Sequence, residues 1–477
     1  MQWRSKRVMI PGAILLGIFL FLAWAIRPVD YTPYFFTDYY QQTRQHLQSA
    51  LDAAELATGP LSAGMARVNI TPAIGAASDD AASGQFQAMP LAGYGDRKGA
   101  PAEGVHDSLF IKAVALRVDG TTAVMITWDG LIFPKEVAEA VAAQAASELG
   151  IGRDRILFSA THSHCGIGAW GEGYLAEQFA GKYNPAVRQW MIQQSMLAIR
   201  QAVADLTPAR LGHGAFRAPQ WVRNRLVKKR GWVDDEFTVC VIRQDDGDYA
   251  VLGAFAAHAT VLSGAVMLMS GDYPGYWQRA VERQIPGEAL FFAGGVGSHG
   301  PGGTGSGFER AQNIGEALAD SVLQLFPSLR LKSTVSLAAA GFRIQLPEHH
   351  VRISDGLRVN PALARKLLPF DTTYVNIMRL DSLLWVGTPT DFSGEMAIDL
   401  KNFARRRGFS AVITSFNGGY VGYLIPGKYY HYNSYESRIM SFFGPYMGPY
   451  FDELIRRAMI GMMDKRPGAV AARSRER

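Results

Sequence analysis

Two histidines, His162 and His164, stand two residues apart, directly after an apolar run and shortly before Gly166. The run, residues 155–158, predicts a buried strand that ends at this pair. Alternate side chains of an extended backbone point to the same side, so we expect the two imidazoles to lie together at the mouth of the strand. Such a pair can bind zinc, or one imidazole can bind a metal while the other transfers protons. Hydrogen-bonded polar residues at a strand end are the structural alternative, and the spacing favours a functional site.

Further polar residues follow other predicted strands, which is where α/β proteins build their sites. His258 closes the apolar run 251–257, and Asp391 follows a strand at 383–386. The Asp391 carboxylate can ligate a metal, although it can equally cap the helix that follows. A glycine-rich loop at 291–307 lacks the Gly-Lys-Ser/Thr of a P-loop but lets backbone N–H groups approach a ligand. A tyrosine cluster at 416–435 can form an aromatic wall, supply a phenolate ligand or stabilise an oxyanion.

The elements that must position these residues alternate between short apolar strands and longer helical stretches. This order predicts an α/β or α+β fold, with a mixed β-sheet core and flanking helices, in one large globular domain over residues 62–463. The predicted strands lie at 109–118, 123–128, 155–159, 251–257, 289–293, 374–380, 382–386 and 411–416, with an antiparallel pair at 333–346; the predicted helices lie at 134–149, 186–204, 276–283, 310–325, 393–407 and 450–463.

Composition and charge narrow the class of protein. The chain has 477 residues, and its 48% hydrophobic and 19% charged residues are typical of a folded protein. Its net charge of +6 is modest for this length. No nucleic-acid-binding motif accompanies that charge, so we expect no nucleic acid partner. The two cysteines, Cys165 and Cys240, allow one disulfide but no framework and no CxxC site. Any metal site must therefore use histidine, carboxylate or phenol ligands.

The N-terminus predicts a membrane location. Residues 1–7 are basic and residues 8–26 are uncharged and mostly apolar, which is long enough to cross a bilayer core of about 30 Å. The charge distribution places a cytoplasmic N-terminus before the span and the globular domain in the periplasm or outside the cell. No small-x-small site ends the span, which favours an uncleaved signal-anchor over a cleaved signal peptide. We expect a juxtamembrane stalk at 27–61 and a basic tail at 464–477.

Several sequence blocks, in the same order, resemble the neutral/alkaline non-lysosomal ceramidase family, which uses zinc to hydrolyse the amide of ceramide. Ser-Ala-Thr-His-Ser-His at 159–164 is similar to the family's Ser-Ala-Thr-His-Thr-His signature. The resemblance covers roughly residues 63–437, the family's N-terminal catalytic domain. The other blocks are Ala-Arg-Val-Asn-Ile-Thr-Pro at 66–72, Gly-Val-His-Asp at 104–107, Asn-Arg at 224–225, Phe-Ala-Ala-His-Ala-Thr at 255–260, Ser-Gly-Asp-Tyr-Pro-Gly-Tyr at 270–276 and Gly-Thr-Pro-Thr-Asp-Phe at 387–392.

The resemblance implies a role for each matched residue. A zinc ion would be held by two histidines, one carboxylate and one tyrosine, while a third histidine faces the scissile amide. An arginine would help to bind the substrate, and a second tyrosine would stabilise the oxyanion. The implied metal ligands are His162, His258, Asp391 and Tyr423; the implied catalytic residues are His164, Arg225 and Tyr435.

The sequence departs from the family at three points. Gly300 stands where the family's Gly-Asp-Val-Ser-Pro has its nucleophilic serine, and Ser298 is a nearby but displaced candidate. Asp391 replaces a glutamate and is one methylene shorter. The chain ends soon after Tyr435, so the family's C-terminal β-rich domain is expected to be absent, while an N-terminal anchor is present.

These observations predict a membrane-anchored zinc amidohydrolase of lipid, and in particular sphingolipid, metabolism. Its partner would be a lipid-like N-acyl substrate whose amide or ester bond is attacked by metal-activated water, because the serine is missing. The alternative is a catalytically degenerate family member that binds a lipid or a glycan. Deacylation of a polysaccharide is a further possibility.

Overall fold

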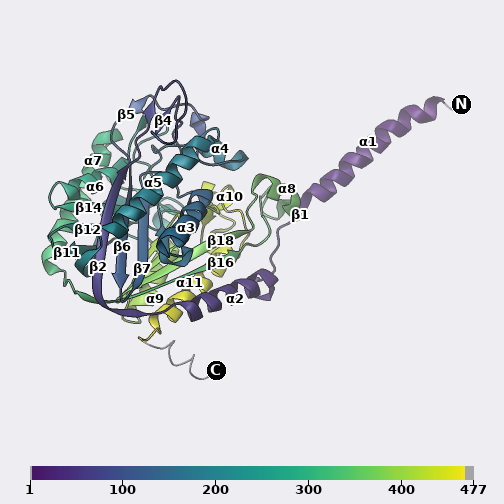
Figure 1. The fold of residues 1–477 in the computed structure, drawn as a ribbon. Coiled ribbons are helices and arrows are strands. Elements are labelled where there is room, and N and C mark those ends of the chain that lie inside the picture. Colours follow the sequence, from purple (N-terminus) through teal and green to yellow (C-terminus); the bar gives the residue numbers. More distant parts are fainter. Residues whose placement is uncertain (1–2, 468–477) are drawn as a thin grey trace.

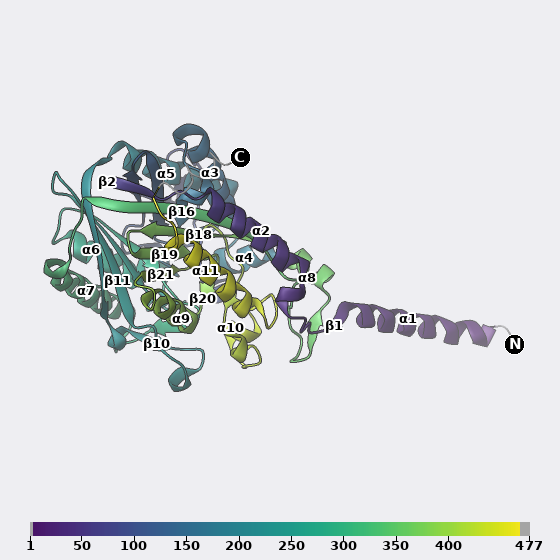
Figure 2. The same ribbon diagram turned by 90° about the horizontal axis from the view of Figure 1, so that it is seen from below.

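The body of the protein is built on a mixed sheet of 12 strands wrapped by helices (Figures 1 and 2). This computed structural model describes residues 3–467, with side chains from residue 14 onward. Residues 1–2 and 468–477, which belong to the two predicted basic segments, and the side chains of residues 3–13 lie outside the described part. Parallel pairs occur between β7 and β8, β12 and β14, and β19 and β21, among otherwise antiparallel neighbours. The predicted mixed-sheet α/β architecture is therefore confirmed. The strands are β2 (Ala57–Asn69), β6 (Phe110–Val118), β7 (Thr121–Trp128), β8 (Ile156–Phe158), β9 (Thr207–Arg217), β11 (Glu236–Gln244), β12 (Tyr249–Phe255), β14 (Gly287–Ala293), β16 (Thr334–Gln345), β18 (Thr372–Leu380), β19 (Leu383–Gly387) and β21 (Ser410–Thr414).

Strand β2 joins the two halves of this sheet. Its first residues pair with β16, and its remaining length pairs with β6 and briefly with β9. The predicted antiparallel pair at 333–346 is wrong: β16 is one 12-residue strand. It cannot fold back on itself because β2 pairs with its first residues, while β18 pairs with its backbone from Leu337 to Gln345.

A core made of strand residues alone lies inside the sheet. Alternation along each strand divides its side chains between two buried faces. In β6, Val114 and Leu116 enter this inner core, while Ile111 and Ala113 pack against helices on the other face. Both faces of the strands are therefore covered, which explains their nearly continuous apolar sequences.

Helices cover the outer faces of the sheet. Helices α6 and α7 pack on each other beside β14, and α2 and α11 lie together on another side (Figure 1). Helix α5 begins with Asn184, whose side chain accepts a hydrogen bond from the Ala186 N–H, and with Pro185 in its first turn. The helices are α2 (Asp38–Ala53), α3 (Lys135–Leu149), α4 (Tyr174–Ala180), α5 (Pro185–Ala204), α6 (Asp272–Glu282), α7 (Gly307–Leu325), α8 (Pro361–Leu367), α9 (Gly394–Arg405), α10 (Tyr435–Arg438) and α11 (Met447–Met463).

Helix α1 (Trp3–Ala25) projects away from the body (Figures 1 and 2). Its described apolar side chains are exposed, Leu15 and Phe19 each by 66%. Its base is held by Asn360, whose side chain donates to the Trp24 carbonyl at 2.8 Å. Among the residues that the structure describes, no helix combines the length and the apolar character needed to cross a membrane.

The segment predicted as a stalk, residues 27–61, is packed against the body from α2 onward. Helix α2 buries Tyr40, Thr43 and Leu47 against β16 and α11. Thr43 accepts a hydrogen bond from the Tyr450 hydroxyl at 2.7 Å. Much of the predicted stalk is thus packed against the domain, which takes in residues before its predicted start at 62.

Short strand pairs complete the fold and support the loops around the site. The pairs important below are β20 (Asp391–Phe392) with β22 (Tyr423–Leu424), and β10 (Val222–Asn224) with β15 (His299–Pro301). The other short strands are β1 (Ile26–Pro28) with β17 (Leu357–Val359), β3 (Ala73–Ile74) with β4 (Gln85–Phe86), and β5 (Gly104–Val105) with β13 (Leu268–Met269).

Candidate metal centre and active site

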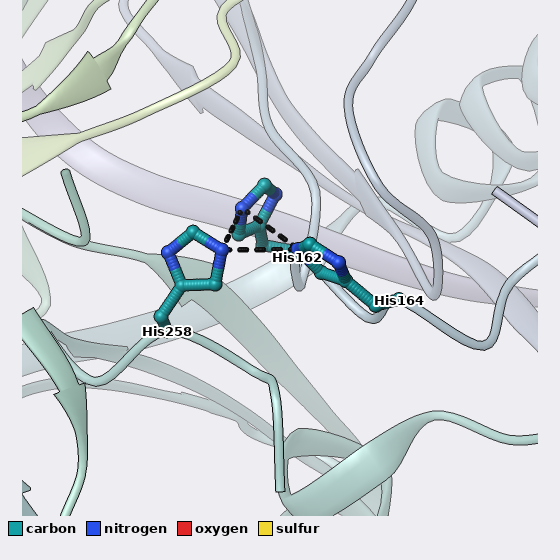
Figure 3. A group of neighbouring side chains, drawn as sticks. All are labelled: His162, His164 and His258. Carbon is teal, nitrogen blue, oxygen red and sulfur yellow. Dashed lines mark hydrogen bonds between the residues drawn. The ribbon is translucent and has the colours of Figure 1, made fainter. Parts of the chain in front are cut away.

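Three histidines converge at the carboxyl ends of two strands (Figure 3). His162 and His164 follow β8, and His258 follows β12. The Nε2 atoms of His162 and His258 are 2.8 Å apart, and that of His164 lies 3.0 Å from His258 and 3.4 Å from His162. All three side chains are buried. The group has the size and the donor type of a three-histidine metal site.

The second ring nitrogens indicate which atoms face the centre of the group. His162 Nδ1 lies 2.6 Å from the Leu131 carbonyl, and His258 Nδ1 lies 3.3 Å from the Val296 carbonyl. A carbonyl only accepts, so each Nδ1 carries the proton and each Nε2 presents a lone pair. Two lone pairs facing each other at 2.8 Å repel unless a cation lies near both. The residues present therefore fit a bound metal.

Asp391 supplies a carboxylate to the same group. Its Oδ1 lies 3.3 Å from His162 Nε2 and 3.8 Å from His258 Nδ1, and this buried oxygen has no hydrogen-bond donor. Its Oδ2 accepts from the Tyr420 hydroxyl at 2.8 Å. A buried carboxylate oxygen without a donor is costly on its own and suits a cation. Asp391 therefore lies beside the histidines and does not cap α9, whose N-cap is Ser393; its role as a ligand stays a prediction.

Burial also controls the protonation of the histidines. Burial, followed by the charges of His162 and Arg225, holds the pKa of His164 well below its usual value. Burial and the charge of Arg225 do the same for the pKa of His258. Both imidazoles are therefore neutral near pH 7, as metal ligation requires.

The backbone around the pair is not the extended strand that the sequence suggested. His162 has φ 63°, in the left-handed region, so the chain turns sharply between β8 and His164. The His162 ring stacks on Phe416 at 4.2 Å between centroids, which fixes its orientation. Gly93 has φ 118°, and a Cβ there would lie 2.6 Å from the His164 ring. The imidazoles meet as predicted, but a turn and long-range packing bring them together.

A buried arginine that the sequence did not single out secures the loop of His164. Arg97 donates to the carbonyls of His164 at 2.5 Å and Val266 at 2.8 Å. It also donates to the Gly264 carbonyl at 3.1 Å. One guanidinium thus joins the loop after β8 to the loop that follows His258. Nothing in the local sequence signals this role, because its partners are carbonyls far along the chain.

Tyr423, Arg225 and Tyr435 form a second layer beside the centre. Register places Tyr423 directly beside Asp391 in the β20–β22 pair. Arg225 donates to the Tyr423 hydroxyl at 2.9 Å and pairs with Glu436 at 3.0 Å. The rings of Tyr423 and Tyr435 meet edge to face at 5.8 Å. Burial and the charge of Asp391 raise the pKa of Tyr423 well above its usual value, so its phenol keeps its proton in the absence of a cation.

A cavity of about 460 Å³ opens beside the histidines and Asp391. His162, His164, Asp391, Tyr423 and Tyr435 all line it, with Tyr420 beside Asp391. Much of the remaining lining is apolar, as in sites that bind apolar ligands. The apolar lining residues include Leu131, Trp170, Leu175, Phe179, Phe370 and Met440.

Ser298 lies outside this cavity, in a separate buried cluster. The backbone N–H of Asp234 donates to His299 Nε2 at 2.9 Å, so His299 Nδ1 carries the proton that faces Ser298 Oγ at 2.8 Å. Ser298 Oγ also accepts from the Gly394 N–H at 3.0 Å. His299 therefore donates to this serine and cannot act as its general base. Gly300 faces the Arg225 side chain, where an added Cβ would lie 3.6 Å from Cδ.

The structure thus brings together the predicted residues His162, His164, His258 and Asp391, with Tyr423, Arg225 and Tyr435 next to them. It places His164 within the histidine group, whereas the sequence had assigned His164 to the substrate; its proton-donor role stays a prediction. Cys165 and Cys240 are both free and buried. Tyr420 is a further polar residue at the centre that the sequence did not single out. Its place in the tyrosine cluster at 416–435 was the only sequence feature that pointed to it.

In sequence and in fold, the chain is similar to neutral ceramidases. A model of the N-terminal region of neutral/alkaline non-lysosomal ceramidases matches residues 73–296, which confirms the resemblance read from the sequence. The matched part contains His162, His164, Arg225 and His258.

Individual relatives agree with that family. The chain is 27% identical over 221 residues to the neutral ceramidase of Mycobacterium tuberculosis, a match that takes in 42% of this chain and 34% of that protein. The chain thus matches about a third of that relative's length. The crystal structure of neutral ceramidase from Pseudomonas aeruginosa superposes with a TM-score of 0.70 at 17% identity, over 86% of this chain and 75% of that one. A ceramidase complexed with C2 superposes with a TM-score of 0.69 at 17% identity, over 86% and 76%. These superpositions show the shared fold.

Proposed function

We propose that this protein is a zinc-dependent hydrolase that cleaves the amide, or an ester, of an acylated lipid-like substrate. One observation carries the proposal: three histidine Nε2 atoms lie close together beside an Asp391 oxygen that accepts no hydrogen bond, at the wall of a largely apolar cavity. His162, His258 and Asp391 would hold the ion, with His164 and Tyr423 in reach of it. A bound zinc ion supplies a Lewis acid and lowers the pKa of water to about 7.

The remaining residues bind and orient the substrate. Tyr435 lines the cavity and Arg225 donates to the Tyr423 hydroxyl beside it. These two donors would stabilise negative charge on a carbonyl oxygen; removal of one such donor typically costs about 3 kcal/mol. His164 is neutral, so it could take the proton that the attacking water gives up and pass it to the leaving amine or alcohol. The apolar wall would hold the acyl chain and exclude bulk water.

Water is the attacking group in this proposal. Gly300 has no side chain, and Ser298 is already held by three polar partners outside the cavity. A serine whose neighbouring histidine donates to it is not activated as a nucleophile. We therefore infer direct hydrolysis without an acyl-enzyme. The degenerate, purely binding alternative is not favoured, because the three histidines and Asp391 are present together with the Tyr420 and Arg225 side chains that support them.

We also propose that α1 attaches the enzyme to a membrane, with the globular domain in the periplasm or outside the cell. The motivation is the uncharged run 8–26 together with the exposed apolar side chains of α1 beyond residue 13. The full chain should then stay with membranes through a carbonate wash, while a chain starting at residue 27 should be released. Release of the full chain by carbonate would overturn this part of the proposal.

The proposed reaction is tested by turnover on N-acylsphingosines and matched acyl esters. Chelation should abolish hydrolysis and added zinc should restore it, and His162→Ala should be inactive. His46→Ala removes a partly exposed histidine of α2 that contacts the Arg343 carbonyl and takes no part in the centre, so it is the matched control. Hydrolysis that survives both chelation and His162→Ala would contradict the proposal.

A further inference from the structure

A second, basic pocket of about 670 Å³ adjoins the candidate active site. Four cationic side chains line it, from Arg223, Arg225, Lys228 and Lys229, and no carboxylate does. Arg225 belongs to both places, because its Nη2 donates to the Tyr423 hydroxyl and Tyr423 lines the cavity. The pocket therefore lies one side chain away from the proposed reaction centre.

Strand geometry explains how the arginines share this pocket. Arg223 lies in β10 and Arg225 follows two residues later, so both point to the same side. Arg223 is opposite Gly300 in the β10–β15 pair. Gly300 places no side chain on that face, and a Cβ built there would meet only Arg225 within 4 Å. The glycine at the position of the family's serine thus leaves room beside the Arg225 side chain.

The lysines are held over the pocket by a fixed turn. The buried Asn224 side chain accepts from the Val227 N–H at 3.0 Å and donates to the Trp232 carbonyl at 3.0 Å. Lys228 has φ 54°, a conformation that is uncommon for a residue with a side chain. The loop is therefore constrained by specific contacts in a conformation that carries two adjacent lysines.

The positive charge in this pocket is largely unmatched. Arg225 pairs with Glu436, whereas no ion pair is formed by Arg223, Lys228 or Lys229 within the described part of the chain. Burial and the charge of Arg223 lower the pKa of the nearby Arg310. Glu395, a carboxylate near this loop, accepts from Asn224 at 3.1 Å and pairs with Lys428 at 3.2 Å.

We propose that this pocket binds an oxyanion, a phosphate or a carboxylate, carried by the acylated substrate on the side of the scissile bond away from the acyl chain. The proposal rests on the proposed function and narrows its substrate class to acylated lipids with an anionic head. Arginine pairs with such groups through two parallel hydrogen bonds, and lysine adds point charges. Arg225 would then contact the anion as well as the reacting carbonyl.

The first test compares two substrates that differ in one phosphate: N-acylsphingosine and N-acylsphingosine 1-phosphate, in neutral detergent micelles at low salt. The measured quantity is the ratio of their kcat/KM values. We expect the phosphorylated substrate to be favoured by about 10-fold, with the difference mainly in KM. The double variant Lys228→Gln/Lys229→Gln should lower that ratio by about 10-fold, and salt should weaken the preference.

The matched control is Arg230→Gln. Arg230 lies in the same short turn and carries the same charge, but it does not line the pocket. The control should keep the wild-type ratio. A wild-type ratio near one, or an equal loss in Arg230→Gln, would overturn the proposal, because a general surface field would then account for any preference.

A second test separates this inference from the proposed function. Binding of a short-chain N-acylsphingosine 1-phosphate, and of inorganic phosphate alone, is measured by calorimetry on His162→Ala protein with and without the lysine substitutions. We expect about 10-fold weaker binding of the lipid phosphate in the lysine variant. If wild-type protein hydrolyses neither substrate but this difference is seen, the hydrolase proposal fails and the anion pocket stands. Equal binding by both proteins would overturn the pocket; tight binding of inorganic phosphate alone would overturn its assignment to the substrate.

Discussion

Two buried clusters of polar side chains lie close together in this fold, and they differ in how completely their atoms are hydrogen-bonded. In the histidine centre, the Nε2 atoms of His162 and His258 face each other with lone pairs, and Asp391 Oδ1 has no donor. In the serine–histidine cluster, Ser298 and His299 satisfy each other and the backbone of neighbouring loops. The first lines the cavity of about 460 Å³, and Ser298 and His299 do not line that cavity.

This difference separates a reactive centre from a structural one. Buried polar groups that are fully paired stabilise a unique packing, whereas groups with an unpaired lone pair or charge need a ligand. Residue types alone suggest the opposite, because a serine beside a histidine resembles a nucleophile and its base. The direction of each hydrogen bond decides which cluster can do chemistry.

The largest expected effect comes from removing one imidazole of the centre. His258→Ala should lose the metal and lower hydrolysis by more than the about 10–100-fold that loss of an outer partner causes. Metal content by mass spectrometry and initial rates measure this. His46→Ala should keep both properties, and full metal content in His258→Ala would place the ion elsewhere.

A smaller loss of metal affinity is expected when the hydrogen bond from Tyr420 to Asp391 is removed. Tyr420→Phe deletes the hydroxyl that donates to Asp391 Oδ2, and such outer partners are typically worth about 10–100-fold in metal affinity or activity. Competition with a chelator of known affinity measures the change. Tyr432→Phe, an exposed tyrosine of the same stretch, is the control. Unchanged affinity in Tyr420→Phe would mean that Asp391 is not a ligand.

His299 should affect stability rather than metal binding. Burial, with the charges of Arg225 and Lys401, lowers the pKa of His299 to about 3, while an unfolded histidine titrates near about 6.5. The unfolded chain thus binds the proton first, and the free energy of unfolding should fall as pH drops from about 6.5 toward 3, by up to about 1.4 kcal/mol per pH unit. In His299→Gln, the free energy of unfolding measured with urea should depend less on pH over that range. The same slope in both proteins would show that His299 is not kept neutral.

The smallest expected effect on rate is that of Ser298→Ala. Loss of a buried hydroxyl leaves its partners unpaired and should lower the free energy of unfolding by about 1–3 kcal/mol. Hydrolysis should stay within a few-fold of wild type, whereas loss of a true serine nucleophile can cost about 10⁶-fold. Ser393→Ala, which removes a hydroxyl 3.1 Å away, should behave alike. If activity were lost in Ser298→Ala but kept in Ser393→Ala, Ser298 would be the nucleophile after all.

Much of the site could be predicted from the sequence, because its residues follow apolar strands whose patterns are local. His162, His258 and Asp391 all come after strand signals, and carboxyl ends of strands meet at one edge of a sheet. The mixed sheet and its flanking helices were predictable for the same reason.

The remaining features depend on contacts between distant parts of the chain. The left-handed turn at His162 is stabilised by stacking on Phe416, and His162 meets His258 from 96 residues away. Helix α2 lies in the segment predicted as a stalk, and only its packing on the sheet shows that it belongs to the domain. Tyr420 is one of several tyrosines until its hydroxyl is seen beside Asp391. No local pattern encodes such pairings.

The most direct measurement is a crystal structure of the purified protein with anomalous data collected on both sides of the zinc edge. Zinc–nitrogen bonds in proteins are about 2.0–2.1 Å long and zinc–oxygen bonds about 2.0–2.2 Å. We expect one strong peak at such distances from Nε2 of His162 and His258 and from Asp391. No peak in active protein, or a peak only at the serine–histidine cluster, would contradict it.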